Sequence, residues 1–186
     1  MSAVIASVAT RPTLRARFWP CIAALVVATL AAASPKARAA DLVLEEFFAG
    51  HLAGEGRLDN RKEGVVRPFA IDLRGAWDGR VMHLAQDVAF ADGERQRHVW
   101  AFTRIGLGRY EGRRDDVIGV AEVTQTGASV RLKYKAHVMS GGSAFDVAFD
   151  ESFTLSAPGT VATWADVSLF FIPVATTQST IRKLER

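Results

Sequence analysis

Cysteine is almost absent from this sequence of 186 residues. The single one, Cys21, lies near the N-terminus, so residues 41–186 contain neither a disulfide nor a thiol nucleophile. Cys21 also stands near the start of the apolar run "FWPCIAALVVATLAAAS", whereas a lipidated cysteine would follow the end of such a run. Its position therefore favours an ordinary apolar residue over a lipid anchor.

Long apolar runs are scarce as well. The only one covers residues 21–34, about 14 residues, which is short of the roughly 20 that a helix needs to cross a bilayer. Basic residues precede this run, and no acidic residue lies in the first 40 positions. This layout favours a signal peptide over a transmembrane anchor, and the rest of the chain has no candidate transmembrane segment.

A cleavage pattern follows the apolar run. The sequence Ala37-Arg38-Ala39 is of the small-x-small type, which predicts cleavage near Ala39 or Ala40. We therefore expect residues 1–40 to be a cleavable signal peptide and residues 41–186 to form one domain. That domain should be periplasmic or otherwise exported.

An excess of positive charge is also missing from the expected domain. Five of the 23 lysines and arginines lie in the first 40 residues, which leaves 18 basic residues against 20 acidic ones. The formal net charge of +3 for the whole chain therefore comes from the N-terminal segment. Because nucleic-acid binding needs a basic surface on the folded domain, we expect no nucleic-acid partner.

Motifs of catalysis and of cofactor binding are absent too. The sequence has no Gly-x-Ser-x-Gly elbow, no phosphate loop and no dinucleotide fingerprint. Its four histidines are not spaced to place two ligands on one metal ion: His51, His83, His98 and His137. We therefore expect no metal and no cofactor.

Alternation of apolar and polar residues is abundant, and turn signals interrupt it at short intervals. The clearest example is "ASVRLKYKAHVM", in which Val130, Leu132 and Tyr134 share one side of a strand. The reversals between such runs are marked by Asp78-Gly79, Asp92-Gly93, Gly106 to Gly108, Gly127, Ser140 to Ser143 and Pro158-Gly159. A last long strand is expected from about Val161, with Pro173 breaking or bending it.

These runs predict an all-β domain of about nine or ten strands, with one short helical turn around Leu44 to Phe48. A sheet of this length must close or fold on itself, because open edges invite association. A single antiparallel up-and-down β-barrel is the first choice and a sandwich the second. The rows expected to face inward are aliphatic and aromatic, so an enclosed ligand should be mostly apolar.

Several segments together resemble a bacterial envelope family known as domain of unknown function 3833. They are "FFAGHLAGEG", "FAIDLRGAWDG", "LAQDVAF", "DGERQRHVW", "YEGRRDDVIGVA" and "GASVRLKYKAHV". The resemblance covers nearly all of the expected domain. It implies a lipocalin-like barrel and implies no activity.

Acidic and basic residues between the predicted strands are candidates for a site. Hairpins could bring together five acidic residues, beside which three arginines lie in the sequence: Asp87, Asp92, Glu94, Asp115 and Asp116, with Arg97, Arg113 and Arg114. Two of the carboxylates could act as an acid–base pair, and an enzyme would use the cluster Asp87, Arg97, Asp115 and Asp116. The alternative is an ion-pair network that closes the barrel mouth. We favour the ion-pair network, because structural networks contain the same residue types as catalytic sites and the cluster alone is therefore no sign of catalysis. Alternation does not say whether Arg97 or its neighbour His98 faces the interior. An inward Arg97 would need a partner, for which Asp87 and Asp116 are the favoured candidates. The alternative is that Arg97 binds the carboxylate or phosphate of a ligand.

The leading hypothesis is a non-enzymatic barrel that binds a small, largely apolar ligand or lipid. The alternatives are an envelope enzyme that uses the Asp/Arg cluster on such a ligand, and a filled barrel that serves as a structural or interaction module. The candidate ligand-binding residues are Arg97, Trp100, Tyr110, Asp115, Asp116 and Tyr134.

Overall fold

The computed structural model of the chain describes residues 41–140 and 142–184. The predicted signal peptide and its cleavage site lie outside the described residues. Within the described part, none of the helices has the length and apolar character needed to cross a membrane.

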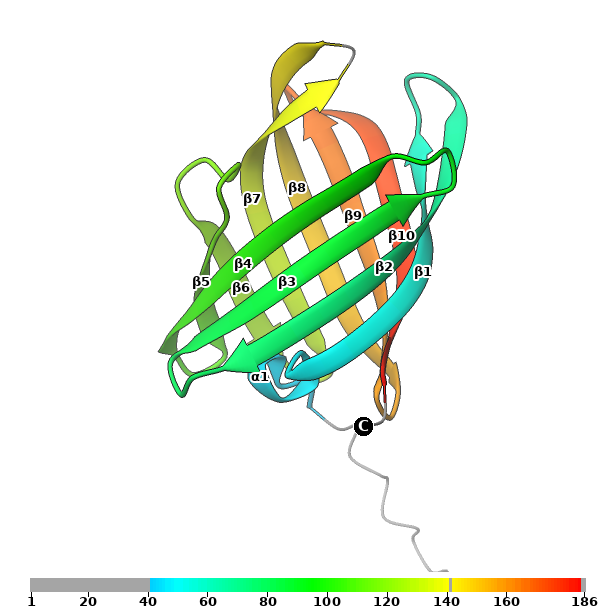
Figure 1. The fold of residues 1–186 in the computed structure, drawn as a ribbon. Coiled ribbons are helices and arrows are strands. Elements are labelled where there is room, and N and C mark those ends of the chain that lie inside the picture. The colour runs from blue at the N-terminus through cyan, green and yellow to red at the C-terminus, as the bar shows by residue number, and fades with distance from the viewer. Residues whose placement is uncertain (1–40, 141, 185–186) are drawn as a thin grey trace, which may run out of the picture. The chain divides into compact units, whose positions relative to one another are not determined.

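Ten antiparallel strands form one closed barrel (Figure 1). Each strand pairs with the next one in sequence, and β1 pairs with β10 to close the ring. The strands are β1 (Gly50–Asn60), β2 (Val65–Trp77), β3 (Val81–Phe90), β4 (Arg95–Gly106), β5 (Arg109–Arg113), β6 (Ala121–Thr126), β7 (Ser129–Ser140), β8 (Ser143–Ala157), β9 (Thr160–Leu169) and β10 (Ile172–Lys183). The up-and-down barrel expected from the alternation is therefore confirmed.

Ring closure brings the backbones of β1 and β10 very close together at Gly54. A Cβ atom at Gly54 would lie 2.3 Å from the carbonyl oxygen of Thr180 and 3.0 Å from Cα of Ile181. Neither atom belongs to a flexible side-chain end, so only glycine fits this position without a backbone shift. Gly54 is thus required by the contact that closes the barrel.

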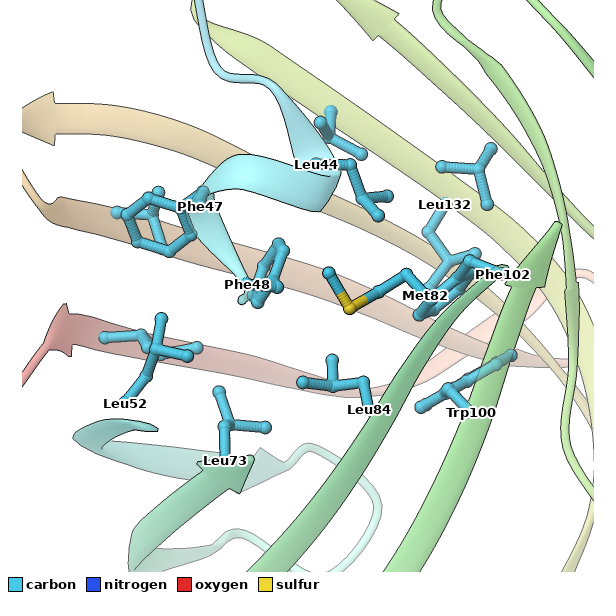
Figure 2. Close-up of a cluster of buried hydrophobic side chains, with 14 of the residues drawn as sticks. Leu44, Phe47, Phe48, Leu52, Leu73, Met82, Leu84, Trp100, Phe102 and Leu132 are labelled. Carbon is cyan, nitrogen blue, oxygen red and sulfur yellow. The ribbon is translucent and has the colours of Figure 1, made fainter. Parts of the chain in front are cut away.

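The short helix α1 (Leu44–Phe47) covers one end of the barrel (Figure 1). Leu44 and Phe48 turn towards the barrel interior, where they meet the buried side chains of Met82 and Leu84 (Figure 2). The fit is close, since a Cβ atom at Gly75 would collide with the carbonyl oxygen of Phe48. The helical turn predicted from the sequence is confirmed, and it acts as a plug.

A buried carboxylate fixes α1 in this place. Glu45 is only 8% exposed, and it accepts a hydrogen bond from the hydroxyl of Tyr110. Its Oε1 also lies 3.0 Å from Nη1 of Arg104. Burial and the nearby Glu45 carboxylate both raise the pKa of Tyr110, which therefore remains a hydrogen-bond donor at neutral pH.

The reversal between β9 and β10 differs from the sequence-based expectation. The sequence predicts one long final strand, whereas the chain turns back at Phe170-Phe171, so that Leu169 pairs with Ile172. Both phenylalanines have positive φ, 48° and 68°, without a glycine or asparagine to signal the turn. Pro173 does mark an irregularity, because the register of β10 against β9 shifts between Pro173 and Ala175.

Replacing Gly54 with alanine should destabilise the barrel by about 1–3 kcal/mol, because the added methyl group forces β1 and β10 apart. Urea unfolding followed by tryptophan fluorescence measures this free energy. The matched control is Gly106→Ala at the end of β4, where the nearest atom to an added Cβ is 3.9 Å away. Equal stability of the two variants would contradict the closure contact described above.

Candidate functional site: an apolar cavity with a polar cluster

The barrel encloses a cavity of about 760 Å³ between the plug and the opposite end. Its wall is built largely of inward-facing aliphatic and aromatic side chains, among them Phe69, Val88, Phe149 and Val167. Leu44 and Phe48 of the plug form its floor, and Met139 and Leu169 lie at the far end. This volume falls within the range of about 300–1,000 Å³ that is usual for small-molecule sites.

Polar side chains gather on one part of this wall, and the loop between β5 and β6 supplies two of them. This loop is held against β7, because the backbone N–H of His137 donates to the carbonyl of Asp116 over 2.9 Å. The N–H of Ile118 donates in the same way to the carbonyl of Lys135 over 2.8 Å. These bonds place Arg114 and Asp116 at the cavity.

Arg114 and Asp116 form a two-pronged ion pair. Nε of Arg114 lies 2.5 Å from Oδ1 of Asp116, and Nη2 lies 2.9 Å from Oδ2. The Arg114 side chain is only 9% exposed and that of Asp116 is 29% exposed. The carboxylate therefore satisfies the guanidinium in a largely desolvated place, where an unpaired charge would be very unfavourable.

Two aromatic rings support the guanidinium of Arg114. Its Cζ atom lies 4.5 Å from the ring centre of Trp100 and 5.2 Å from that of Tyr134. Cation–π contacts of this kind hold a planar guanidinium in a fixed orientation. Arg114 is thus positioned by three side chains from three different parts of the chain.

Tyr134 connects this arginine to a second carboxyl group. The Tyr134 hydroxyl donates a hydrogen bond to Oε1 of Glu151 over 2.6 Å. Burial raises the pKa of Glu151, while the hydrogen bond from Tyr134 and the charge of Arg114 act in the opposite direction. Burial also raises the pKa of Tyr134, which keeps its hydroxyl protonated.

His98 completes the cluster on β4. Burial lowers its pKa and the nearby Arg114 lowers it further, with Asp116 opposing them. Its imidazole is therefore neutral at pH 7, with one nitrogen as donor and the other as acceptor. We call the group formed by His98, Arg114, Asp116, Tyr134 and Glu151 the polar cluster.

A second paired arginine lies nearer the end opposite the plug. Arg67 contacts Asp92 at 2.7 Å and Glu94 at 2.5 Å, and its Cζ lies 4.1 Å from the ring centre of Phe90. Both carboxylates have a lowered pKa, with hydrogen bonds from neighbouring side chains as the main cause. Arg67 and Glu94 thus place a second set of paired charged groups on the cavity wall.

The structure separates the six predicted ligand-binding residues into two groups. Trp100, Asp116 and Tyr134 line the cavity. Arg97 and Asp115 are exposed, and Tyr110 is buried beside the plug, where it binds Glu45. The three residues in this second group are not placed where they could contact a ligand in the cavity.

The predicted cluster of Asp87, Arg97, Asp115 and Asp116 is not assembled. Arg97 faces outward and lies 3.8 Å from Asp87 on the outer surface, while Asp116 faces inward to Arg114. The expected partnership of Arg97 with Asp87 exists, but an exposed pair of this kind contributes little. His98, Trp100 and Phe102 are the inward row of β4, because the larger aromatic side chains gain more from burial.

Glu151 was missed by the sequence analysis, and Arg114 was named there only as a sequence neighbour of the acidic residues. Glu151 lies in register with the inward row of Phe149 and Phe153, so a charged residue in an otherwise aromatic row was the available signal. Arg114 follows Tyr110 and Gly112 in register, but it lies after the end of β5, where alternation no longer guides a prediction.

The donor set does not favour a metal ion. Within the described ranges, no three histidine, aspartate, glutamate or cysteine side chains are placed so that they could hold a metal ion together. The polar cluster instead offers hydrogen-bond donors and acceptors beside an apolar wall, an arrangement suited to orienting an organic molecule.

Three solved structures have a similar fold. The S-type phycobiliprotein lyase CPES from Guillardia theta has a TM-score of 0.56 and 13% identity, and the match covers 78% of this chain and 94% of the lyase. The protein Rv2717c from M. tuberculosis has a TM-score of 0.56 and 14% identity, with 78% and 100% covered. A protein of unknown function of the DUF3598 family from Nostoc punctiforme has a TM-score of 0.57 and 16% identity.

The match to the Nostoc protein covers 82% of this chain and 53% of that one, so the present chain spans about half of its length. At these identities the three likenesses establish the fold alone. No sequence among curated proteins matches this chain. The sequence does match the family described as protein of unknown function DUF3833 over residues 22–183. Since this match spans most of the chain, the protein belongs to the DUF3833 family.

Proposed function

We propose that this barrel binds one small, largely apolar molecule, such as a lipid, in its cavity. The observation that carries the proposal is the cavity of about 760 Å³, with an apolar wall and the polar cluster on one part of it. The apolar part of a ligand would gain roughly 25 cal/mol for each Å² removed from water. The polar cluster would fix the orientation of the ligand.

The chemistry of the polar cluster suggests which ligand group it receives. Arg114 is already paired with Asp116, and the pKa of Glu151 lies above its ordinary value. The cluster therefore has no unpaired charge to offer a ligand. It offers instead the hydrogen-bond donors and acceptors of Tyr134, Glu151 and His98. A ligand with a hydroxyl, carbonyl or carboxyl group at one end of an apolar body suits it best.

Binding is favoured over catalysis. The acidic cluster on which an enzymatic alternative depended is divided between the outer surface and the interior. The likeness to a phycobiliprotein lyase supports a barrel that handles a small molecule, and at 13% identity it does not extend to the lyase's activity. Native mass spectrometry of protein purified from its host tests the proposal directly through any lipid that co-purifies.

Replacing Ala165 with phenylalanine should lower the affinity for an uncharged apolar probe by about tenfold or more, because the ring fills part of the cavity. Ala165 lines the cavity and is buried. The probe is N-phenyl-1-naphthylamine, whose fluorescence rises when it leaves water, and titration gives its Kd.

The control is Ala162→Phe, the same change on the outer face of the same strand, where the side chain is exposed. This variant should bind the probe as the wild type does. If the wild-type protein does not bind the probe, or if Ala165→Phe binds it equally well, the cavity is not a binding site.

Replacing Glu151 with glutamine should stabilise the fold increasingly as the pH rises. Folding raises the pKa of Glu151 above its ordinary value of 4.5, so the folded state holds this proton more tightly than the unfolded state does. The resulting stability is fully present below pH 4.5 and is lost as the pH rises through the folded pKa. The glutamine variant has no such loss.

Urea unfolding of both proteins at several pH values between 4 and 8 measures the difference. The other titrating groups are shared by the two proteins and cancel from the comparison. A constant difference in unfolding free energy across this range would show that Glu151 titrates as an ordinary exposed carboxyl group.

Export belongs to the same proposal. If the N-terminal segment is cleaved after Ala39 or Ala40 during secretion, the protein recovered from the periplasm or the medium should begin at Ala40 or Asp41. N-terminal sequencing of the protein from each cell fraction provides the measurement. An intact Met1 on protein found in the cytoplasm would exclude export.

A further inference from the structure

The turn between β9 and β10 carries two phenylalanines that the protein itself does not bury. Phe170 is 81% exposed and Phe171 is 98% exposed, and Ile172 beside them is 66% exposed. Side chains of this kind normally contribute to a core, because removing them from water is strongly favourable. Here that gain is absent from the folded monomer.

The backbone of this turn makes the choice of residues more unusual. Phe170 and Phe171 are the two non-glycine residues with positive φ among those described. A bulky side chain disfavours this region, whereas an Asn-Gly pair adopts it readily. Folding alone would therefore favour other residues at both positions. The presence of two phenylalanines there points to a contact outside the barrel.

Further apolar side chains are exposed at the same end of the barrel. Val65 and Val66 begin β2, next to the end of β1, which in turn pairs with the start of β10. Met139 lies near the tip of the β7–β8 hairpin and is 69% exposed. The two hairpins β1–β2 and β7–β8 stand at the end opposite α1 (Figure 1). The term apolar rim denotes Val65, Val66, Met139, Phe170, Phe171 and Ile172 below.

Two lysine or arginine side chains accompany the apolar rim. Arg61 and Lys62 are exposed in the turn between β1 and β2, together with one acidic residue, Glu63. The backbone N–H of Arg61 donates to the carbonyl of Val174 over 2.9 Å, which holds this turn against β10 close to Ile172. Within residues 41–140 and 142–184, neither Arg61 nor Lys62 forms an ion pair with a carboxylate.

We propose that the apolar rim docks on an anionic lipid bilayer, with Phe170, Phe171 and Ile172 in the interfacial layer. Arg61 and Lys62 contact lipid phosphates there. Aromatic side chains that project from a loop and are flanked by cations are suited to this layer, where apolar groups and anionic headgroups meet. A protein partner would require about 800 Å² of matching surface, whereas the apolar rim consists of narrow projecting turns that a fluid surface accommodates.

The docking surface and the cavity share one end of the barrel. Lys62, Met139 and Leu169 line the cavity and lie at or beside the apolar rim. A barrel docked in this way has the end of its cavity at the lipid surface. The docking proposal concerns the outer surface, and it stands or falls independently of ligand binding.

Flotation of the protein, purified from its host, with vesicles tests the proposal. The vesicles contain equal parts of phosphatidylglycerol and phosphatidylcholine, and vesicles of phosphatidylcholine alone serve for comparison. The double variant Phe170→Asn with Phe171→Gly removes both rings and introduces residues that favour positive φ. It should lose vesicle binding by about tenfold or more, because two apolar anchors are removed, while its melting temperature stays equal or rises.

Two further variants make the test specific. Leu107→Asn removes a side chain that is 95% exposed at the plugged end of the barrel, and it should bind vesicles as the wild type does. Arg61→Gln with Lys62→Gln should weaken binding to the anionic vesicles by about fivefold per cation and leave binding to the neutral ones unchanged. N-phenyl-1-naphthylamine should bind the wild type, the Phe170→Asn/Phe171→Gly variant and Leu107→Asn alike, because none of these three positions lines the cavity, and this separates docking from the cavity.

Three results would overturn the proposal. The first is that the wild type fails to float with anionic vesicles. The second is that the variant Phe170→Asn with Phe171→Gly floats as well as the wild type does. The third is that the wild type binds no lipid and sediments as a dimer that this variant abolishes, which would make the apolar rim an interface between two copies of the chain.

Discussion

The pairing of β1 with β10 closes the barrel and thereby creates its interior. The two strands lie far apart in the sequence, so their contact requires the chain entropy of nearly the whole domain to be lost. A continuous ladder from Leu52 and Lys183 to Asn60 and Ala175 offsets that loss and leaves the sheet without a free edge. Without it, the alternating rows of apolar side chains would have no common interior. Because the two backbones pass so closely at Gly54, a side chain at this position would interfere with closure.

The closed ring is filled at one end and hollow at the other. Residues before the first strand supply the filling, since Leu42, Leu44, Phe47 and Phe48 are all buried. The carboxylate of Glu45 is satisfied by Tyr110 and Arg104, which fixes the orientation of α1 in a way that apolar contacts alone do not. The plug therefore forms the floor of the cavity. Without it, the cavity would extend into the end of the barrel that the plug now fills.

Sequence patterns predicted the strands better than the site. Asp78-Gly79 and Asp92-Gly93 marked two hairpins, because each glycine adopts a positive φ and each aspartate side chain accepts a backbone hydrogen bond from a residue that follows it. The reversal at Phe170-Phe171 carried no such signal, since its residues disfavour those angles. Within the site, Tyr134 could be assigned to the interior from the apolar row that it shares with Val130 and Leu132. Trp100 and Arg97 could not be assigned, because alternation defines two faces of their strand and does not say which is inner. The burial of Arg114 depends on how the β5–β6 loop crosses β7, a long-range contact that local pattern does not encode.

The polar cluster is held by the core that surrounds it. The ring of Trp100 stacks on Phe102 at 5.0 Å towards the packed end and meets Tyr134 edge to face at 5.2 Å. Tyr134 in turn stacks on Phe149 at 4.6 Å. This row of rings supports both the guanidinium of Arg114 and the hydroxyl that binds Glu151, so neither polar group can move without disturbing the packing. A site that is rigid before its ligand arrives loses less conformational entropy on binding. For the ligand binding proposed above, side chains held in this way would allow a few hydrogen bonds to select one molecule among many of similar size, although most of the cavity wall is apolar.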